Sequence, residues 1–196
     1  MEELVNIKPP PAVGKIWAAS AELGFDMACD ALTGSLLRSL AASKPGGRFL
    51  ELGTGTGAST AWLLAGMNEN AQLITVELEP NYSRVAQKIL GQDPRVTFVI
   101  ENGTTFLYEH QHETFDLIFA DTWPGKYWHL EPTLAMVKPG GFYLIDDMLP
   151  QENWPEDHAP MVAALIEALE AREDFAITKL NWASGWLICT RRSAHN

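Results

Sequence analysis

Short apolar runs alternate with amphipathic stretches over most of this chain. Five runs rich in Val, Ile, Leu and Phe predict buried strands at residues 48–52, 72–77, 95–100, 115–120 and 141–146. Each run is followed by apolar residues at helical spacing, which predicts helices over 58–67, 80–90, 103–110, 127–137 and 158–172. Strands that alternate with helices in this way form a parallel sheet with helices packed on its faces.

The N-terminal part of the chain follows a different pattern. Residues 1–14 include Pro9, Pro10 and Pro11 and predict an extended arm, because proline fixes φ and lacks a backbone donor. Leucine spacing in residues 15–44 predicts helices that are broken near Gly24 or Gly34.

The C-terminal part predicts a hairpin, because residues 175–181 and 186–190 read as strands on either side of a Ser-Gly turn. The whole pattern predicts one α/β domain over residues 1–196, with its core at 45–196. We expect a Rossmann-like, doubly wound sheet of seven strands with helices on both faces. It should be mostly parallel, with an antiparallel C-terminal hairpin.

Length and composition are those of a globular protein. The chain has 196 residues, of which 46% are hydrophobic and 20% charged, and this excludes a disordered or fibrous chain. Cys29 and Cys189 lie in apolar surroundings, which predicts buried thiols rather than a disulfide framework. The N-terminus is acidic and no apolar run approaches the ~20 residues of a membrane span, so we expect a cytoplasmic protein.

The charge narrows the range of partners. Fourteen Lys and Arg against 25 Asp and Glu give a net charge of −11. Nucleic acids and anionic membranes attract basic surfaces, so neither is an expected partner. A small-molecule substrate, with a cation bound where acids cluster, is the better expectation.

A glycine-rich turn follows the first predicted strand. Gly53, Gly55 and Gly57 allow the backbone to turn sharply and to approach a ligand, and the next helix begins with free N–H groups. Alone this is a weak signal, because Gly53, Gly55 and Ala58 also match the dinucleotide pattern G-x-G-x-x-A. Binding of NAD therefore stays open at this point.

Acidic and polar residues around this turn favour another ligand. Glu51 would repel a pyrophosphate but would suit a cationic amino group. Glu77 ends the second predicted strand, where a carboxylate can accept two hydrogen bonds from a ribose diol, and it suits NAD as well as the other ligand. Asn102, Gly103 and Thr104 follow the third strand and could border an adenine; the alternative is an ordinary turn.

The chain resembles the class I S-adenosylmethionine-dependent methyltransferases, and among them the cation-dependent O-methyltransferases typified by catechol O-methyltransferase. The resemblance covers roughly residues 30–190. It depends on the segments Leu50-Glu51-Leu52-Gly53, Ile74-Thr75-Val76-Glu77, Phe119-Ala120-Asp121-Thr122-Trp123 and Ile145-Asp146-Asp147. The last two segments are the more specific to the cation-dependent branch.

The resemblance implies a role for each matching residue in holding the cofactor. Gly53, Thr54, Gly55 and Gly57 would cradle its methionine part, Ser59 would bond the methionine carboxylate or amine, and Glu77 would bind the ribose. Glu51 and Asp121 would lie close to the cofactor, Asn102, Gly103 and Thr104 would border its adenine, and Trp123 would flank it.

The same resemblance implies a metal site at Asp121, Asp146 and Asp147. The residues themselves agree, because the fourth and fifth strands should be neighbours whose carboxyl ends meet at one edge. Carboxylate oxygens suit Mg²⁺, Mn²⁺ or Ca²⁺. The alternative for Asp146 and Asp147 is an ordinary loop or helix cap after a strand.

Two departures from the family pattern affect the chemistry. Pro124 replaces the lysine that removes the hydroxyl proton in the catechol enzymes, and the second metal position holds Asp147 where the family has Asn. Lys126, Asp147 and His129 are the candidate proton acceptors, although a lysine two residues beyond the family position is more often a surface residue.

The resemblance therefore implies methyl transfer to a hydroxyl of a small molecule, assisted by a divalent cation. Aromatic residues at the predicted crevice would suit a flat acceptor: Trp123, Trp128, Trp154, Trp182 and Trp186. The alternatives are a metal-independent methyltransferase, an NAD-dependent oxidoreductase and a non-catalytic cofactor-binding module. A homodimer is a further expectation from the family.

Overall fold

The computed structural model describes residues 7–151 and 154–193. Its seven strands form one sheet in the order β3-β2-β1-β4-β5-β7-β6. The strands are β1 (Arg48–Leu52), β2 (Gln72–Glu77), β3 (Val96–Ile100), β4 (Phe115–Ala120), β5 (Val137–Ile145), β6 (Phe175–Leu180) and β7 (Trp186–Arg191). The first five are parallel, whereas β7 runs antiparallel to both β5 and β6. The predicted fold class is confirmed.

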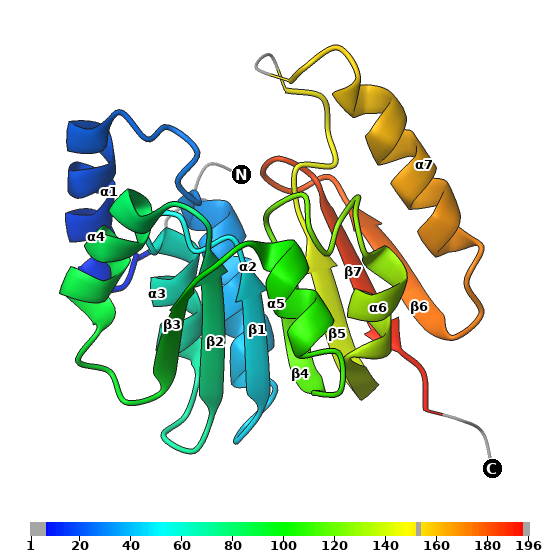
Figure 1. Ribbon diagram of the computed structural model, residues 1–196, viewed down its shortest axis with the longest axis horizontal. Helices are drawn as coiled ribbons and strands as arrows, with labels where there is room; N and C mark the ends of the chain where they lie inside the picture. The colour runs from blue at the N-terminus through cyan, green and yellow to red at the C-terminus, as the bar shows by residue number, and fades with distance from the viewer. Residues whose placement is uncertain (1–6, 152–153, 194–196) are drawn as a thin grey trace.

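Helices cover both faces of the sheet (Figure 1). The described helices are α1 (Pro11–Leu23), α2 (Ala31–Ala42), α3 (Ala58–Gly66), α4 (Pro80–Leu90), α5 (Gly103–Glu109), α6 (Leu130–Ala135) and α7 (His158–Glu170). One apolar cluster packs α1 to α4 on one face, and a second packs α5 to α7 on the other. In Figure 1, α5 and α6 lie in front of the sheet and α2 lies behind it.

The break predicted near Gly24 or Gly34 is at Gly24. Gly24 has φ 67°, a left-handed conformation that suits glycine, and its N–H closes the last turn of α1. Gly34 lies inside α2, where a Cβ would come 2.1 Å from the indole nitrogen of Trp62. The second glycine therefore allows α2 to pack closely on α3 and does not end a helix.

Three predicted elements begin more than two residues away from their predicted positions. Helix α1 begins at Pro11, inside the expected arm, because proline is well suited to the first position of a helix. The helix expected over 127–137 is reduced to α6, since the preceding residues form tight turns and His129 adopts φ 61°. Strand β5 begins at Val137 instead of residue 141. The additional residues fit because the pairing of β5 with β4 shifts in register between Phe115 and Leu117.

The sheet brings the carboxyl ends of β1 and β4 together at its centre. Strand β2 lies on one side of β1 and β4 lies on the other, so the strand order reverses between β1 and β4. In doubly wound sheets, ligands bind outside the carboxyl ends of the strands at such a reversal. These strand ends form the upper edge of the sheet in Figure 1. Among the described residues, none of the helices is long and apolar enough to cross a membrane.

Candidate functional site

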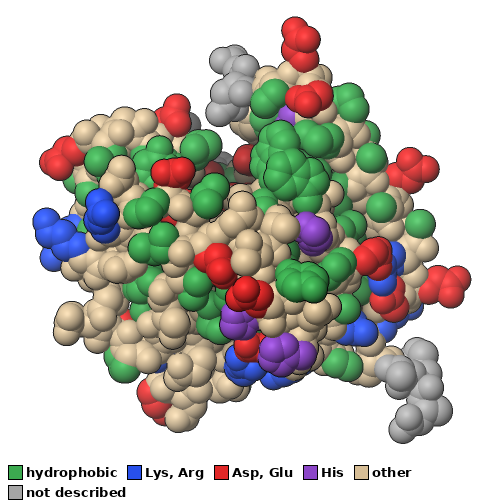
Figure 2. All heavy atoms as spheres, in the orientation of Figure 1, with side chains coloured by type: hydrophobic (Ala, Val, Ile, Leu, Met, Phe, Trp, Pro, Cys, Tyr) green, Lys and Arg blue, Asp and Glu red, His purple; other side chains and the backbone are tan. Residues whose placement is uncertain are grey.

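A cavity of about 590 Å³ lies at this edge of the sheet, within the range of small-molecule sites. Its walls come from the turn after β1, the ends of β2, β4 and β5, the segment between α1 and α2, and the start of α7. Figure 2 shows the molecule hollowed at its upper edge, with hydrophobic side chains gathered on one rim.

The glycine turn forms one wall. Gly53, Gly55 and Gly57 all have positive φ, at 101°, 52° and 97°. At Gly53 a Cβ would lie 2.7 Å from the carbonyl oxygen of Asp121, so only glycine allows β1 and β4 to approach this closely. Gly53, Thr54, Gly55 and Ser59 line the cavity, whereas Gly57 packs on Ala86 behind it.

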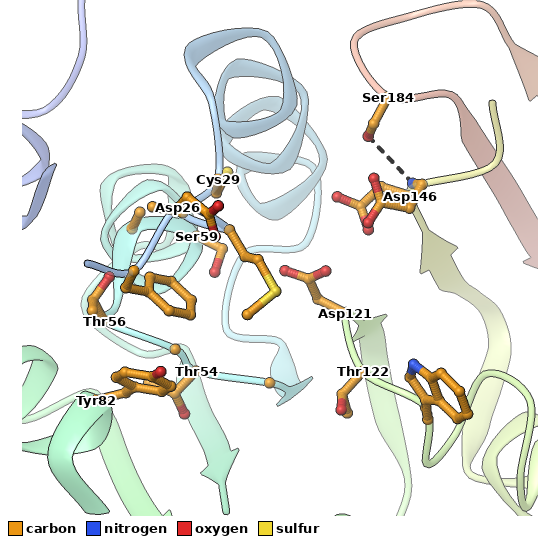
Figure 3. A pocket seen from close by; sticks show the side chains of 18 of the residues that line it. Asp26, Cys29, Thr54, Thr56, Ser59, Tyr82, Asp121, Thr122, Asp146 and Ser184 are labelled. Carbon is orange, nitrogen blue, oxygen red and sulfur yellow. Dashed lines mark hydrogen bonds between the residues drawn. The ribbon is translucent and has the colours of Figure 1, made fainter. Parts of the chain in front are cut away.

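The segment between α1 and α2 closes over this turn (Figure 3). The hydroxyls of Ser20 and Thr56 are 2.7 Å apart and connect α1 to the turn. The ring of Phe25 lies beside Gly55 and packs against Tyr82 with ring centroids 4.6 Å apart. Sequence reasoning missed Phe25 and Tyr82 as cavity residues, because only the tertiary fold brings α1 and α4 to the glycine turn.

Glu77 and Glu51 occupy different places. Glu77 lines the cavity, and its two carboxylate oxygens accept hydrogen bonds from the backbone N–H groups of Gly55 (2.7 Å) and Glu79 (2.9 Å). Glu51 is fully buried beneath the turn, where it accepts hydrogen bonds from the hydroxyls of Thr60 and Thr75. The expected direct contact of Glu51 with a ligand is therefore not met, because its side chain has no surface on the cavity.

Burial changes the protonation of Glu51. Loss of solvation raises the pKa of this carboxyl to about 7, although hydrogen bonds from neighbouring hydroxyls counteract part of the shift. One of its oxygens, Oε1, has no hydrogen-bond partner among the described residues. Its other oxygen connects β1 to α3 and β2, because it accepts from Thr60 and Thr75.

Three carboxylates converge on the opposite wall. Asp121 follows β4 and Asp146 and Asp147 follow β5, and one oxygen from each lies within 4.8 Å of the others. Asp121 and Asp146 point toward one another in Figure 3. Burial and mutual repulsion raise the pKa of Asp121, and burial raises the pKa of Asp146 to about 6.

Asp146 has a buried carboxylate oxygen that could accept a ligand. Its side chain is buried, and its Oδ1 has no hydrogen-bond partner among the described residues. Asp147 adopts φ 56°, which is strained for a residue with a side chain, and its N–H donates to the hydroxyl of Ser184 at 3.2 Å. The β6–β7 turn thus holds the Asp146-Asp147 pair against the cavity.

Lys126 is buried beside these carboxylates and not on the surface as expected. Its Nζ donates a 2.7 Å hydrogen bond to the carbonyl oxygen of Asp146. The reason is a tight turn in which the N–H groups of Lys126, Tyr127 and Trp128 all donate to the carbonyl of Trp123. This turn points the lysine back toward the strand end.

Other predicted residues lie away from the cavity lining. Asn102 accepts a hydrogen bond from the N–H of Thr104 and caps α5, and Gly103 lies beside Pro124. Their expected place beside an adenine stays a prediction. His129 precedes α6. Of the five tryptophans, Trp123 and Trp154 line the cavity, whereas Trp186 is buried in the core against Phe119.

Cys29 also differs from the prediction. It is half-buried and lines the cavity, whereas Cys189 is buried as expected. Both thiols have a raised pKa, chiefly because they are desolvated. Neither is poised as a thiolate nucleophile.

Residues 50–148 match the family model described as a methyltransferase domain. That stretch extends from the glycine turn to the carboxylates after β5, so it includes both walls of the cavity. The chain belongs to the methyltransferase-domain family. The resemblance seen in the sequence is confirmed at this level.

Relatives in two mycobacterial genera are similar over part of their length. One relative is a protein of Mycolicibacterium vanbaalenii with the name "Putative O-methyltransferase". It is 31% identical over 138 residues, which cover 66% of this chain and 61% of that protein. A protein of the same name from Mycobacterium sp. strain KMS is 35% identical over 116 residues, covering 56% and 53%. The chain thus spans less than two thirds of these relatives.

Solved structures share the fold of this methyltransferase domain. The O-methyltransferase TomG of Streptomyces achromogenes, in complex with SAM, superposes with a TM-score of 0.83 at 23% identity, covering 96% of this chain and 93% of that one. The O-methyltransferase of Bacillus cereus, in complex with SAH, gives 0.82 at 19% identity, covering 96% and 94%. At these identities the similarity is one of fold.

Proposed function

We propose that this methyltransferase domain transfers a methyl group from S-adenosylmethionine to a hydroxyl of a small, flat molecule, with a divalent cation bound at Asp121, Asp146 and Asp147. The observation that carries the proposal is the buried, unpartnered Oδ1 of Asp146, which lies in the same cavity as the glycine turn. The names of the relatives and of the similar structures support O-methylation.

The residues present suit the cofactor. Gly53 and Gly55 leave the backbone open for close approach, and the hydroxyl of Ser59 lies on the same wall. Each oxygen of Glu77 accepts one backbone hydrogen bond and keeps a second lone pair for a ribose hydroxyl. Thr122, beyond β4, offers a surface on which an adenine would lie, whereas Trp123 packs with Tyr127 and His158 on the other side of the cavity.

The residues present also suit a divalent cation. The three donors are carboxylates, which Mg²⁺ and Mn²⁺ prefer, and without a cation their repulsion favours proton uptake. When bound, such an ion supplies positive charge that lowers the pKa of a hydroxyl coordinated to it. Lys126 adds a fixed positive charge from the chain itself, donating to the carbonyl of Asp146.

The chain's own residues would mainly orient the reactants. The glycine turn and Glu77 hold one wall and the carboxylates hold the other, so donor and acceptor are confined between them. Such positioning contributes several kcal/mol to rate acceleration, of order 7–11 in favourable cases. Trp123 and Trp154 suit a flat acceptor. Asp147 and Lys126 are the candidates to receive or stabilise the proton that leaves the acceptor hydroxyl.

The test compares Asp146→Ala with Asp26→Ala, an exposed acid on the same cavity that lies outside the carboxylate cluster. Methyl transfer from S-adenosylmethionine to 3,4-dihydroxybenzaldehyde is measured in Mg²⁺ and in EDTA. We expect Asp146→Ala to lose at least about 100-fold of the Mg²⁺-stimulated rate, because a buried ligand is removed, while Asp26→Ala keeps it. Equal loss of S-adenosylhomocysteine binding in Asp146→Ala would show that the residue is structural.

A metal-independent methyl transfer is the second candidate. Lys126 favours it, because the buried ammonium already compensates part of the negative charge of the three carboxylates. Under this alternative the rate in EDTA equals the rate in Mg²⁺. The same assay therefore decides between the two.

A further inference from the structure

A ring of aromatic side chains encloses the acceptor side of the cavity. Trp123 and Tyr127 come from the turn after β4, Trp154 from the segment before α7, and His158 from the first position of α7. The His158 ring lies 4.4 Å from Trp154, 5.3 Å from Tyr127 and 6.2 Å from Trp123, measured between ring centroids. The imidazole is thus held by packing on three sides.

One polar contact lies inside this ring. The Tyr127 hydroxyl is 3.0 Å from Nε2 of His158. The other ring nitrogen, Nδ1, is buried and has no hydrogen-bond partner among the residues that the structure describes. Burial and the nearby charge of Lys126 lower the pKa of His158, so the imidazole is neutral at pH 7 and carries one N–H.

The unpartnered Nδ1 determines where that hydrogen lies. If Nδ1 carried it, a buried donor would lack an acceptor, which costs of order 1–3 kcal/mol. If Nε2 carries it, Nε2 donates to the oxygen of Tyr127 and Nδ1 is left only with a lone pair. In both tautomers Nδ1 lacks a partner among the described residues, but a buried N–H without an acceptor is rarer in proteins than an acceptor without a donor. The expected tautomer is therefore Nε2–H, with Tyr127 as the acceptor of that bond.

This assignment leaves the phenolic hydrogen of Tyr127 available. Burial and the charges of Asp147 and Asp146 raise the pKa of Tyr127 to about 12, so the phenol keeps its proton. Tyr127 makes no other side-chain hydrogen bond in the described part of the chain, and it lines the cavity with Asp146 and Asp147. A phenol in that position can donate to an oxygen of a bound molecule.

We propose that Tyr127 donates a hydrogen bond to an oxygen of the methyl acceptor, and that His158 is the positioning residue that holds the phenol for this contact. The proposal rests on the proposed function and adds a requirement to it: the acceptor carries an oxygen that accepts from Tyr127, in addition to the hydroxyl that reacts. Trp154 and Trp123 then form the walls of a site for a flat molecule, and the edge of that molecule contacts Tyr127.

The first test needs no substrate. Ring ¹⁵N chemical shifts of His158, measured by NMR on the whole chain at pH 7.5 and assigned with His158→Gln, report the tautomer. We expect the neutral Nε2–H form. A neutral Nδ1–H form would overturn the proposal, because Nε2 would then be an acceptor and the hydroxyl of Tyr127 would donate to it.

The second test measures binding of 3,4-dihydroxybenzaldehyde by calorimetry, with S-adenosylhomocysteine and Mg²⁺ present. Tyr127→Phe removes only the hydroxyl, and we expect the Kd of the probe to rise about five- to tenfold. His158→Phe should give a similar loss. His158→Gln should keep most of the affinity, because its amide N–H can replace Nε2–H as the donor to Tyr127.

Binding of S-adenosylhomocysteine alone separates the possible failures. If it binds within twofold of wild type in every variant and Tyr127→Phe leaves the probe Kd unchanged, the proposal fails and the proposed function stands. If the wild type binds S-adenosylhomocysteine but not the probe, the acceptor-side assignment is overturned. If the wild type binds neither, the proposed function itself fails.

Discussion

The ammonium of Lys126 lies among three carboxylates in the cavity of this methyltransferase domain. It is buried, and its hydrogen bond to the carbonyl of Asp146 fixes it beside the end of β5. The charge balances part of the repulsion between Asp121 and Asp146, whose carboxyls both have a raised pKa. Removing it should affect turnover more than cofactor binding.

We therefore expect Lys126→Met to lower kcat at least about tenfold while S-adenosylhomocysteine affinity stays within twofold. Lys126→Arg keeps the charge but cannot take up a proton. If the charge is what matters, Lys126→Arg keeps most of the rate and Asp147 receives the proton; if Lys126 is the base, both variants fail equally. A kcat within twofold of wild type in Lys126→Met would remove the residue from the mechanism.

Glu51 makes stability depend on pH. Its pKa is raised by burial from the ordinary 4.5 to about 7, so the folded state binds the proton more tightly than the unfolded state. The stabilisation is complete below pH 4.5 and is lost as the pH rises through 7. Over pH 5 to 8 the wild type should lose about 2–3 kcal/mol of unfolding free energy through this residue.

Glu51→Gln should abolish that component, because an amide does not titrate. The measurement is urea unfolding of wild type and variant at pH 5 and pH 8, with exposed Glu79→Gln as the control. An equal pH dependence in wild type and Glu51→Gln would contradict the assigned pKa shift.

At the scale of elements, the glycine turn joins β1 to α3 under tight steric limits. Gly53 has φ 101° and a Cβ there would meet the Asp121 carbonyl at 2.7 Å, while Gly140 has φ 74° and no described heavy atom within 4 Å of such a Cβ. Gly140→Ala should therefore cost only the left-handed strain, about 1–2 kcal/mol. Gly53→Ala should cost about 3 kcal/mol or more and should weaken S-adenosylhomocysteine binding.

Urea unfolding and calorimetry measure both effects. If Gly53→Ala and Gly140→Ala lose the same free energy of unfolding, the close approach of β1 and β4 does not require glycine at position 53.

Elements with strong periodicity were predictable from the sequence, and those shaped by tertiary contacts were not. Strands β1, β2 and β4 and helix α4 match their predicted ranges, because apolar runs, Pro80 and Gly91 mark them locally. The turn over 123–128 is different: its hydrogen bonds to Trp123 and the bond from Tyr143 to Gly125 depend on packing against β5. That turn determines where Lys126 lies, and no local pattern in the sequence predicts the turn.

At the scale of the whole molecule, the order of the strands creates the site. Parallel pairing of β1, β4 and β5 brings Gly53, Asp121 and Asp146 to one edge, which the alternation of strands and helices was enough to predict. The covering residues Phe25, from the segment after α1, and Tyr82 and His158, from α4 and α7, approach the cavity in a way that the sequence does not encode locally. The candidate ligands were thus predictable, and the enclosure of the cavity was not.

The most direct test of the account is calorimetric titration of S-adenosylhomocysteine into the whole chain, once in EDTA and once in Mg²⁺. We predict micromolar binding at one site in both buffers, because the glycine turn and Glu77 do not require the cation. Glu77→Ala should weaken it at least tenfold and Glu79→Ala, which removes the same charge from the cavity rim, should not. Absence of binding to the wild type in both buffers would contradict the account.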